Sequence, residues 1–139
     1  TGLADIRAAL GRIQNHIHRT PILTSSAINA IAGRDLHFKC EMFQKMGAFK
    51  IRGALNAVTV LQSQDPSLRT VVTHSSGNHA QAIALACKMK QLNAHVVMPE
   101  NAPQVKKEAV MGYGATVHSC KPTLAAREET AQQALWASS

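Results

Sequence analysis

The chain has 139 residues, of which 45% are hydrophobic and 17% charged. This size suits one globular domain with a real core and is too short for two full domains. No apolar run approaches the roughly 20 residues of a membrane span, and the first residues lack a secretory signal. We therefore expect no membrane association, and the missing initiator Met predicts a trimmed chain.

Cysteine and charge patterns narrow the class of protein. Cys40, Cys87 and Cys120 stand far apart without a CxxC pair, so we expect no disulfide framework, no zinc ribbon and a cytoplasmic location. The net charge of +7 comes from 15 Lys and Arg against 8 Asp and Glu, but the basic residues are scattered. We expect no nucleic-acid partner; a small acidic ligand, or an acidic remainder of the protein, explains the charge equally well.

The first 69 residues predict helices around one short strand. Apolar residues at helical spacing predict helices over residues 3–17 and 50–62, and Ser25 and Gly33 can start and stop a short helix between them. Alternation predicts a strand over residues 36–40. We expect this strand to join a sheet that other parts of the protein complete.

Strands and helices alternate more regularly after this segment. We predict strands over residues 70–73, 94–98 and 115–119, and helices over residues 78–91, 103–111 and 123–136. This βαβαβα order implies right-handed crossovers and a parallel sheet, so the fold class is α/β. Ligands of such sheets bind beyond the carboxyl ends of the strands, which makes the loops after the strands the candidate sites.

The first candidate loop covers residues 73–79, Thr-His-Ser-Ser-Gly-Asn-His. Its small residues let backbone N–H groups converge, and the positive end of the following helix adds to them, so the loop can hold a carboxylate. A plain turn capped by Ser and Asn is the alternative. Two serines between His74 and His79 are more polar than a cap requires.

The second candidate is Lys50, within the sequence Lys-Met-Gly-Ala-Phe-Lys-Ile-Arg-Gly of residues 45–53. It stands near the start of a predicted helix, where a cation opposes the helix dipole. That position favours a neutral amine, the form that attacks an aldehyde to make a Schiff base. A lysine whose stem passes the core edge while its amine stays in water is the alternative.

The histidines predict no metal site. His16 and His18 lie two residues apart, which points them to different sides of a helix. His37, His95 and His118 have no second ligand at zinc spacing.

Taken together, the two loops resemble those of the fold-type II pyridoxal phosphate enzymes, the group of serine and threonine dehydratases and serine racemases. Residues 47–54, Gly-Ala-Phe-Lys-Ile-Arg-Gly-Ala, resemble the segment of that family that forms the Schiff base. Residues 74–79 resemble its substrate-carboxylate loop. Val97-Met98-Pro99 and Lys106-Lys107 extend the resemblance over essentially the whole chain.

The resemblance implies pyridoxal 5'-phosphate as the cofactor and assigns roles to five residues. Lys50 would form the Schiff base, Phe49 would flank the cofactor, and Asn78 would hydrogen-bond its ring hydroxyl. The substrate carboxylate would be bound by Ser75, Asn78 and His79.

Ser76 favours one branch of the family. Threonine-type dehydratases usually carry a residue without a proton to give at this place, whereas serine racemases carry Ser on the cofactor face opposite the lysine. Racemisation needs a proton donor on each face, so the resemblance implies Lys50 and Ser76 as catalytic residues. Loss of the β-hydroxyl from the same intermediate would give pyruvate and ammonia, the lyase reaction.

Two departures from the family pattern are visible. Ala48 replaces the usual Ser, and Ala80 follows His79 where racemases more often have Gly and dehydratases have Ala. The phosphate cradle, the residue facing the pyridine nitrogen and the acidic cation site of the family belong to a second half. We therefore expect this sequence to be the N-terminal portion of a longer enzyme.

Regulation by ATP is a further implication of the resemblance. Serine racemases bind ATP, and four residues here stand at matching positions: Lys45, Gln81, Lys106 and Tyr113. The family also implies Mg²⁺, whose ligands would lie outside this sequence.

These inferences combine into one expected enzyme. Residues 1–69 would be the N-terminal segment of a large pyridoxal phosphate domain, and residues 70–139 a small α/β domain. The function would be that of a serine racemase, an isomerase of amino-acid metabolism with serine dehydratase activity, acting on L-serine, D-serine and L-threonine as a homodimer when complete. A dehydratase without racemase activity, and a truncated carboxylate-binding module without catalysis, stay open as alternatives.

Overall fold

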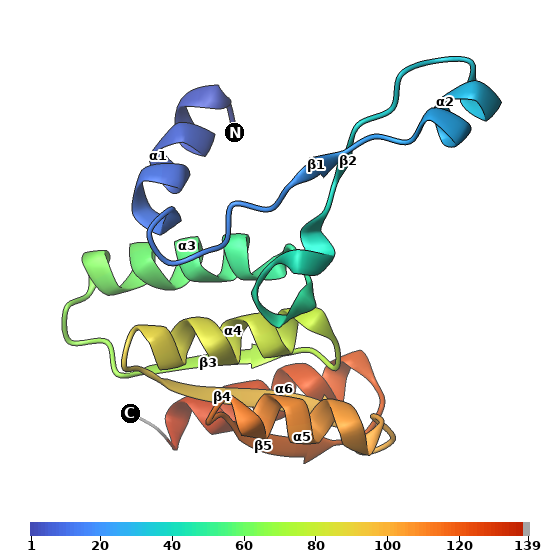
Figure 1. Cartoon of the computed structure of the whole chain (residues 1–139). Coiled ribbons are helices and arrows are strands. Elements are labelled where there is room, and N and C mark those ends of the chain that lie inside the picture. Colours follow the sequence, from blue (N-terminus) through green and yellow to red (C-terminus); the bar gives the residue numbers. More distant parts are fainter. Residues whose placement is uncertain (138–139) are drawn as a thin grey trace. The chain divides into compact units, whose positions relative to one another are not determined.

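The computed structural model describes residues 1–137 (Figure 1). It forms two compact units, residues 1–49 and the chain from Lys50 onward. The helix over residues 50–64 therefore packs with the strands that follow it. The expected boundary at residue 69 concerns the domains of a complete enzyme and stays a prediction.

Short elements make up the first unit. They are α1 (Leu3–Ile13), β1 (Ile22–Leu23), α2 (Ser26–Ala32), β2 (Phe38–Lys39) and the 3₁₀ turns η1 (Glu41–Phe43) and η2 (Lys45–Gly47). The first helix stops four residues before the predicted end at residue 17. The second has the predicted bounds, because Ser25 Oγ accepts a hydrogen bond from the Ile28 N–H at 3.4 Å and Gly33 closes it at φ +65°.

The strand expected over residues 36–40 finds its partner within the chain. In the structure β2 pairs antiparallel with β1, with Ile22 opposite Lys39 and Leu23 opposite Phe38. The expectation that other parts of the protein supply this partner is thus wrong for the pairing seen here. Two residues are too few for an alternating pattern, so the sequence could not reveal β1.

The second unit is an α/β layer structure. Its elements are α3 (Lys50–Gln64), β3 (Thr70–His74), α4 (Asn78–Met89), β4 (Asn93–Pro99), α5 (Gln104–Gly112), β5 (Thr116–Cys120) and α6 (Leu124–Trp136). The strands are parallel in the order β3-β4-β5. Helices α4 and α5 cover one face of the sheet and α6 covers the other (Figure 1). The predicted βαβαβα unit and its parallel sheet are confirmed.

The core of this unit lies around the central strand. Val96, Val97 and Met98 are fully buried, as expected for a strand with helices on both faces. Helix α3 buries Ile51 and Leu55 and packs against α4, whose buried residues are mostly alanines. This packing fixes the start of α3, and with it Lys50, relative to α4.

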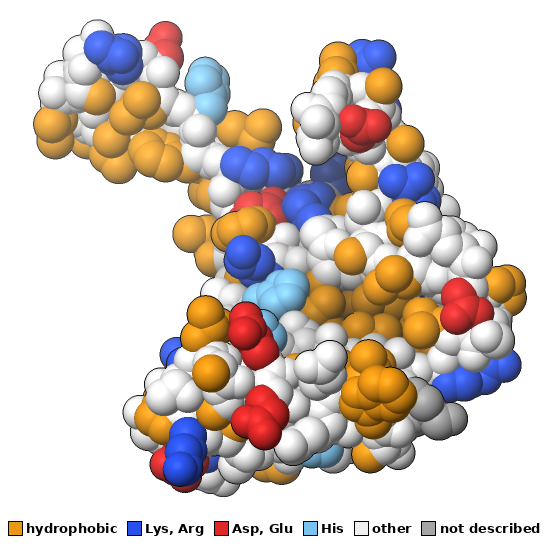
Figure 2. All heavy atoms as spheres, turned by 180° about the vertical axis from the view of Figure 1, so that it is seen from behind, with side chains coloured by type: hydrophobic (Ala, Val, Ile, Leu, Met, Phe, Trp, Pro, Cys, Tyr) orange, Lys and Arg blue, Asp and Glu red, His pale blue; other side chains and the backbone are white. Residues whose placement is uncertain are grey.

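Charged side chains are spread over the surface. In Figure 2 the Lys and Arg side chains of the visible face are scattered among acidic and apolar ones and form no continuous block. Within residues 1–137, no helix combines the length and apolar character needed to cross a bilayer.

Candidate active site

The serine loop lies at the carboxyl end of β3. The Ser75 N–H donates to the Val97 carbonyl at 3.1 Å, which extends the β3–β4 pairing by one residue. The Gly77 N–H then reaches back to Ser75 Oγ at 3.4 Å. No side chain caps α4, so the N–H groups of its first turn and its positive end are directed at this loop. The loop therefore has the construction of an anion site.

Three basic side chains act on one another at this loop. Burial lowers the pKa of His79, and the positive charges of Lys50 and then His74 lower it further. The start of α3 and the first turn of α4 thus share one electrostatic environment. Such surroundings favour a bound anion and a neutral imidazole at pH 7.

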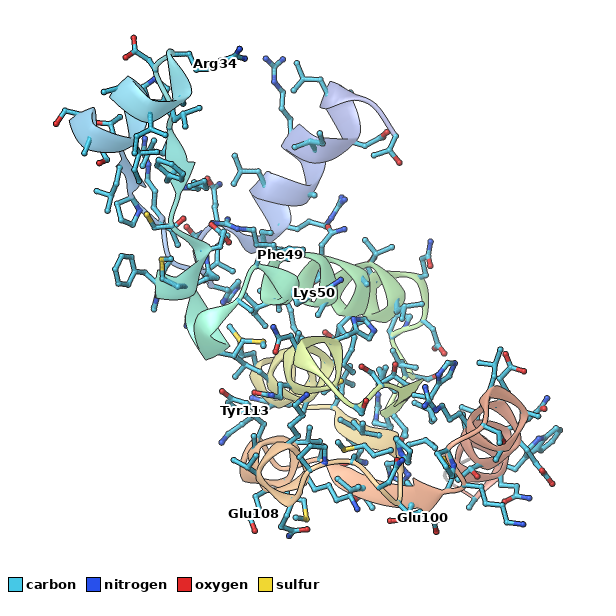
Figure 3. All side chains as sticks on the ribbon, turned by 90° about the vertical axis from the view of Figure 1, so that its right-hand side faces the viewer. Arg34, Phe49, Lys50, Glu100, Glu108 and Tyr113 are labelled. Carbon is cyan, nitrogen blue, oxygen red and sulfur yellow. The ribbon has the colours of Figure 1, made fainter. Side chains whose placement is uncertain are left out.

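The chain reaches Lys50 through a tight turn. Met46 and Gly47 have φ angles of +57° and +70°, the left-handed region that Gly adopts readily and Met rarely does. Ala48 is buried, and Lys50 is then the first residue of α3, where it is exposed (Figure 3).

A buried glutamine holds the segment that precedes this turn. Gln44 is only 3% exposed. Its Oε1 accepts from the N–H groups of His18 (2.9 Å) and Lys45 (3.0 Å), and its Nε2 donates to the His18 carbonyl at 2.8 Å. His18 Nδ1 donates to the Phe43 carbonyl at 3.0 Å. These bonds tie residues 43–45 to residue 18, so they position the start of the lysine motif.

The remaining predicted site residues are spread over several elements. Ser75 and Ser76 are half-buried in the loop, whereas Asn78 and His79 are exposed in the first turn of α4. Phe49 is 58% exposed immediately before α3 (Figure 3).

The structure does not unite the four positions matched to an ATP site. Gln81 is half-buried on α4, Lys106 is exposed on α5, and Tyr113 is half-buried just after α5. Lys45 belongs to the first compact unit. The ATP site stays a prediction.

Sequence reasoning missed two contributors to this region. Gln44 was part of no motif, and its partner His18 is 26 residues away, so no local pattern indicated their bonds. His74 was noted as a polar neighbour only. Its place beside the motif was the one signal of its effect on His79.

Comparison with known proteins assigns the class. Residues 13–138 match the family model described as "Pyridoxal-phosphate dependent enzyme", and the chain belongs to this family. Among curated relatives, it is 53% identical over 131 residues to a serine racemase of Dictyostelium discoideum and 48% identical over 132 residues to one of Homo sapiens. Each alignment covers 94% of this chain, but only 40% and 39% of the respective relative. The chain thus spans about two fifths of the length of these relatives.

Solved structures give the same picture. Dictyostelium discoideum serine racemase superposes with a TM-score of 0.92 at 51% identity, over 99% of this chain and 44% of that one. A pyridoxal 5'-phosphate-dependent aspartate racemase also gives 0.92, at 45% identity, over 99% and 43%. A threonine deaminase of the organism abbreviated T.th. gives 0.87 at 39% identity, over 99% and 42%. The resemblance to fold-type II enzymes is thereby confirmed.

The residues present fit the cofactor of this family. A primary amine at the start of α3 is the group that an aldehyde requires, and the positive charges of Lys50 and His74 that act on His79 suit an anionic ligand. Asn78, in the first turn of α4, offers an amide that can hydrogen-bond a ring hydroxyl.

Proposed function

We propose that the complete protein is a pyridoxal phosphate-dependent serine racemase that also eliminates water and ammonia from serine. The observation that carries this proposal is the shared electrostatic environment of Lys50 and the serine loop. The relatives named serine racemase, at about half identity over 94% of the chain, support the same reaction.

Lys50 would hold the cofactor and move the first proton. Pyridoxal 5'-phosphate supplies an aldehyde that binds amino groups and a ring system that stabilises negative charge at Cα. Lys50 would hold this aldehyde through its amine, with Phe49 beside the ring and Asn78 at the ring hydroxyl. When substrate replaces it, the neutral Lys50 amine would take the proton from Cα.

Ser76 would decide the stereochemical outcome. Its hydroxyl would give a proton to Cα from the side opposite Lys50, which inverts the centre. Reprotonation by Lys50 itself restores the original configuration, and departure of the β-hydroxyl leads to pyruvate and ammonia. Ser76 needs to be close to Cα and partly shielded from water, and its half-buried position supports this role.

The loop and the first turn of α4 would bind the substrate carboxylate. Ser75, Asn78 and His79 provide hydroxyl, amide and backbone N–H donors there, and the uncapped start of α4 adds its positive end. Because burial and neighbouring charge keep His79 neutral, it can orient the carboxylate through a hydrogen bond without adding a full charge.

Two alternatives keep some support. Ala80 matches the dehydratase pattern noted in the sequence, and the similarity to threonine deaminase favours a dehydratase without racemase activity. The similarity to aspartate racemase favours the same chemistry on a different amino acid. The carboxylate-binding module without catalysis has no specific observation in its favour.

The finer properties of the complete protein are proposals as well. We propose L-serine, D-serine and L-threonine as substrates, a homodimeric assembly and a cytoplasmic location. The proposed ATP site would use Gln81, Lys106 and Tyr113 together with Lys45, and Mg²⁺ would bind outside this chain.

Assays in deuterium oxide test the proposed reaction. The complete protein with pyridoxal 5'-phosphate is incubated separately with L-serine, L-threonine and L-aspartate. We expect D-serine labelled with deuterium at Cα, together with pyruvate. Pyruvate without D-serine would support the dehydratase, racemised aspartate with unchanged serine would support the aspartate enzyme, and no turnover of any substrate would support the binding module.

A further inference from the structure

His95 and His118 form an imidazole pair on two neighbouring strands. His118 Nε2 lies 3.1 Å from His95 Nδ1, although the residues are 23 positions apart in the chain. The ring centroids are 5.0 Å apart, and the ring planes differ by 28°. Spacing along the chain could not indicate this pair, and the proposed racemase site does not use it.

The register of the parallel sheet explains why the rings meet. His95 lies opposite Thr116, and His118 lies opposite Val97. Residues two positions apart on a strand point to the same face, so the histidines are diagonal neighbours on one face. Two hydrogen-bonded strands therefore hold both rings before any ligand arrives.

We infer that His95 and His118 chelate a divalent transition-metal ion of the imidazole-preferring class, with Cu²⁺ bound most tightly. A metal–nitrogen distance of about 2.0–2.1 Å and the observed 3.1 Å separation give a nitrogen–metal–nitrogen angle of about 100°. This angle lies between those of square-planar and tetrahedral coordination. Small rotations of the two rings exchange their hydrogen bond for two metal bonds.

The surroundings suit this class of ion. Both rings are half-buried, so each keeps some exposure to solvent. Burial, followed by the charge of His118, lowers the pKa of His95, which keeps that ring in the neutral form that binds metals. Within residues 1–137 no cluster of three or more His, Cys, Asp and Glu side chains could hold a metal, so water fills the other positions. Mg²⁺, which prefers oxygen ligands, does not bind here.

Copper titration of the complete protein tests this inference. The protein, loaded with pyridoxal 5'-phosphate and stripped of metal by a chelator, is titrated with Cu²⁺ at neutral pH and followed by electron paramagnetic resonance. We expect a tight site with two nitrogen ligands that excess Mg²⁺ does not displace. His95→Gln and His118→Gln each weaken it by about 10²-fold, because two linked ligands become one. The control His37→Gln, at an exposed residue of the first unit, leaves it unchanged.

Two outcomes overturn the inference. One is an unchanged Cu²⁺ affinity in both Gln variants, with circular dichroism showing that they are folded. The other is a wild-type spectrum with fewer than two nitrogen ligands, which decides the matter even if a variant does not fold.

Discussion

Lys50 and His79 begin two different helices, and the positive charge of Lys50 helps to lower the pKa of the His79 imidazole. Burial is the larger cause, and the charge of His74 is the third. The lysine motif and the serine loop, which the sequence presents as separate features, therefore belong to one site in the second compact unit.

Removing the Lys50 charge should raise the pKa of His79 toward its ordinary value of 6.5. Lys50→Ala eliminates one of the two positive neighbours that oppose protonation of the imidazole. Titration of the His79 ring by NMR, in the complete protein without cofactor, measures the change. Lys88→Ala, which removes an exposed lysine nearer the other end of α4, is the matched control. An equal pKa in both variants would show that Lys50 and His79 do not interact.

His79 should also make folding stability depend on pH. Its pKa in the folded protein lies below 6.5, so the unfolded chain binds more protons between the two pKa values. The contribution of a neutral His79 is complete above about pH 6.5 and is lost as the pH falls through the folded pKa. In His79→Gln, urea unfolding should therefore show less loss of stability on acidification. The variant His37→Gln should keep the parental slope, and a parental slope in His79→Gln would contradict the account.

Ser76→Ala should separate racemisation from elimination. Without this hydroxyl, the Lys50 amine can still remove the Cα proton, but no donor remains on the other side. Formation of D-serine should fall by roughly 10²–10⁴, the usual effect of one positioned acid or base, while pyruvate formation survives to a larger extent. Ser119→Ala, at an exposed serine of β5, should leave both rates unchanged. D-serine production at the parental rate in Ser76→Ala would assign Ser76 to carboxylate binding or to structure only.

Gln44→Ala should destabilise the segment before the lysine motif. The substitution leaves the N–H groups of His18 and Lys45 and the His18 carbonyl without their buried partner. We expect a loss of about 2–3 kcal/mol in unfolding free energy, with faster amide hydrogen exchange at His18 and Lys45. Gln64→Ala, at an exposed helix end, should change stability by less than about 0.5 kcal/mol. Unchanged exchange at both amides would show that Gln44 does not hold this segment.

The elements from β3 to α6 could be predicted from the sequence because their signals are local. The apolar run Val96-Val97-Met98 indicates a buried strand, Gly33 ends a helix, and alternating strands and helices imply a parallel sheet. Bonds across long stretches of chain leave no such trace. The pairing of β1 with β2, the bonds of Gln44 with His18 and the contact of His95 with His118 all depend on tertiary packing.

The candidate site divides in the same way. Lys50 and the serine loop stand out by residue type, by their places near helix starts and by resemblance to a family. Their electrostatic coupling could not be predicted, because it depends on how α3 packs against α4. The role of each site residue stays a prediction.

Reductive trapping tests the central claim most directly. The complete protein with pyridoxal 5'-phosphate is treated with borohydride, digested and mapped by mass spectrometry. The account predicts a pyridoxyl group on Lys50 and none in Lys50→Ala, whereas Lys88→Ala keeps the label on Lys50. A pyridoxyl group on Lys45 or Lys106, or no labelled peptide from folded protein, would contradict it.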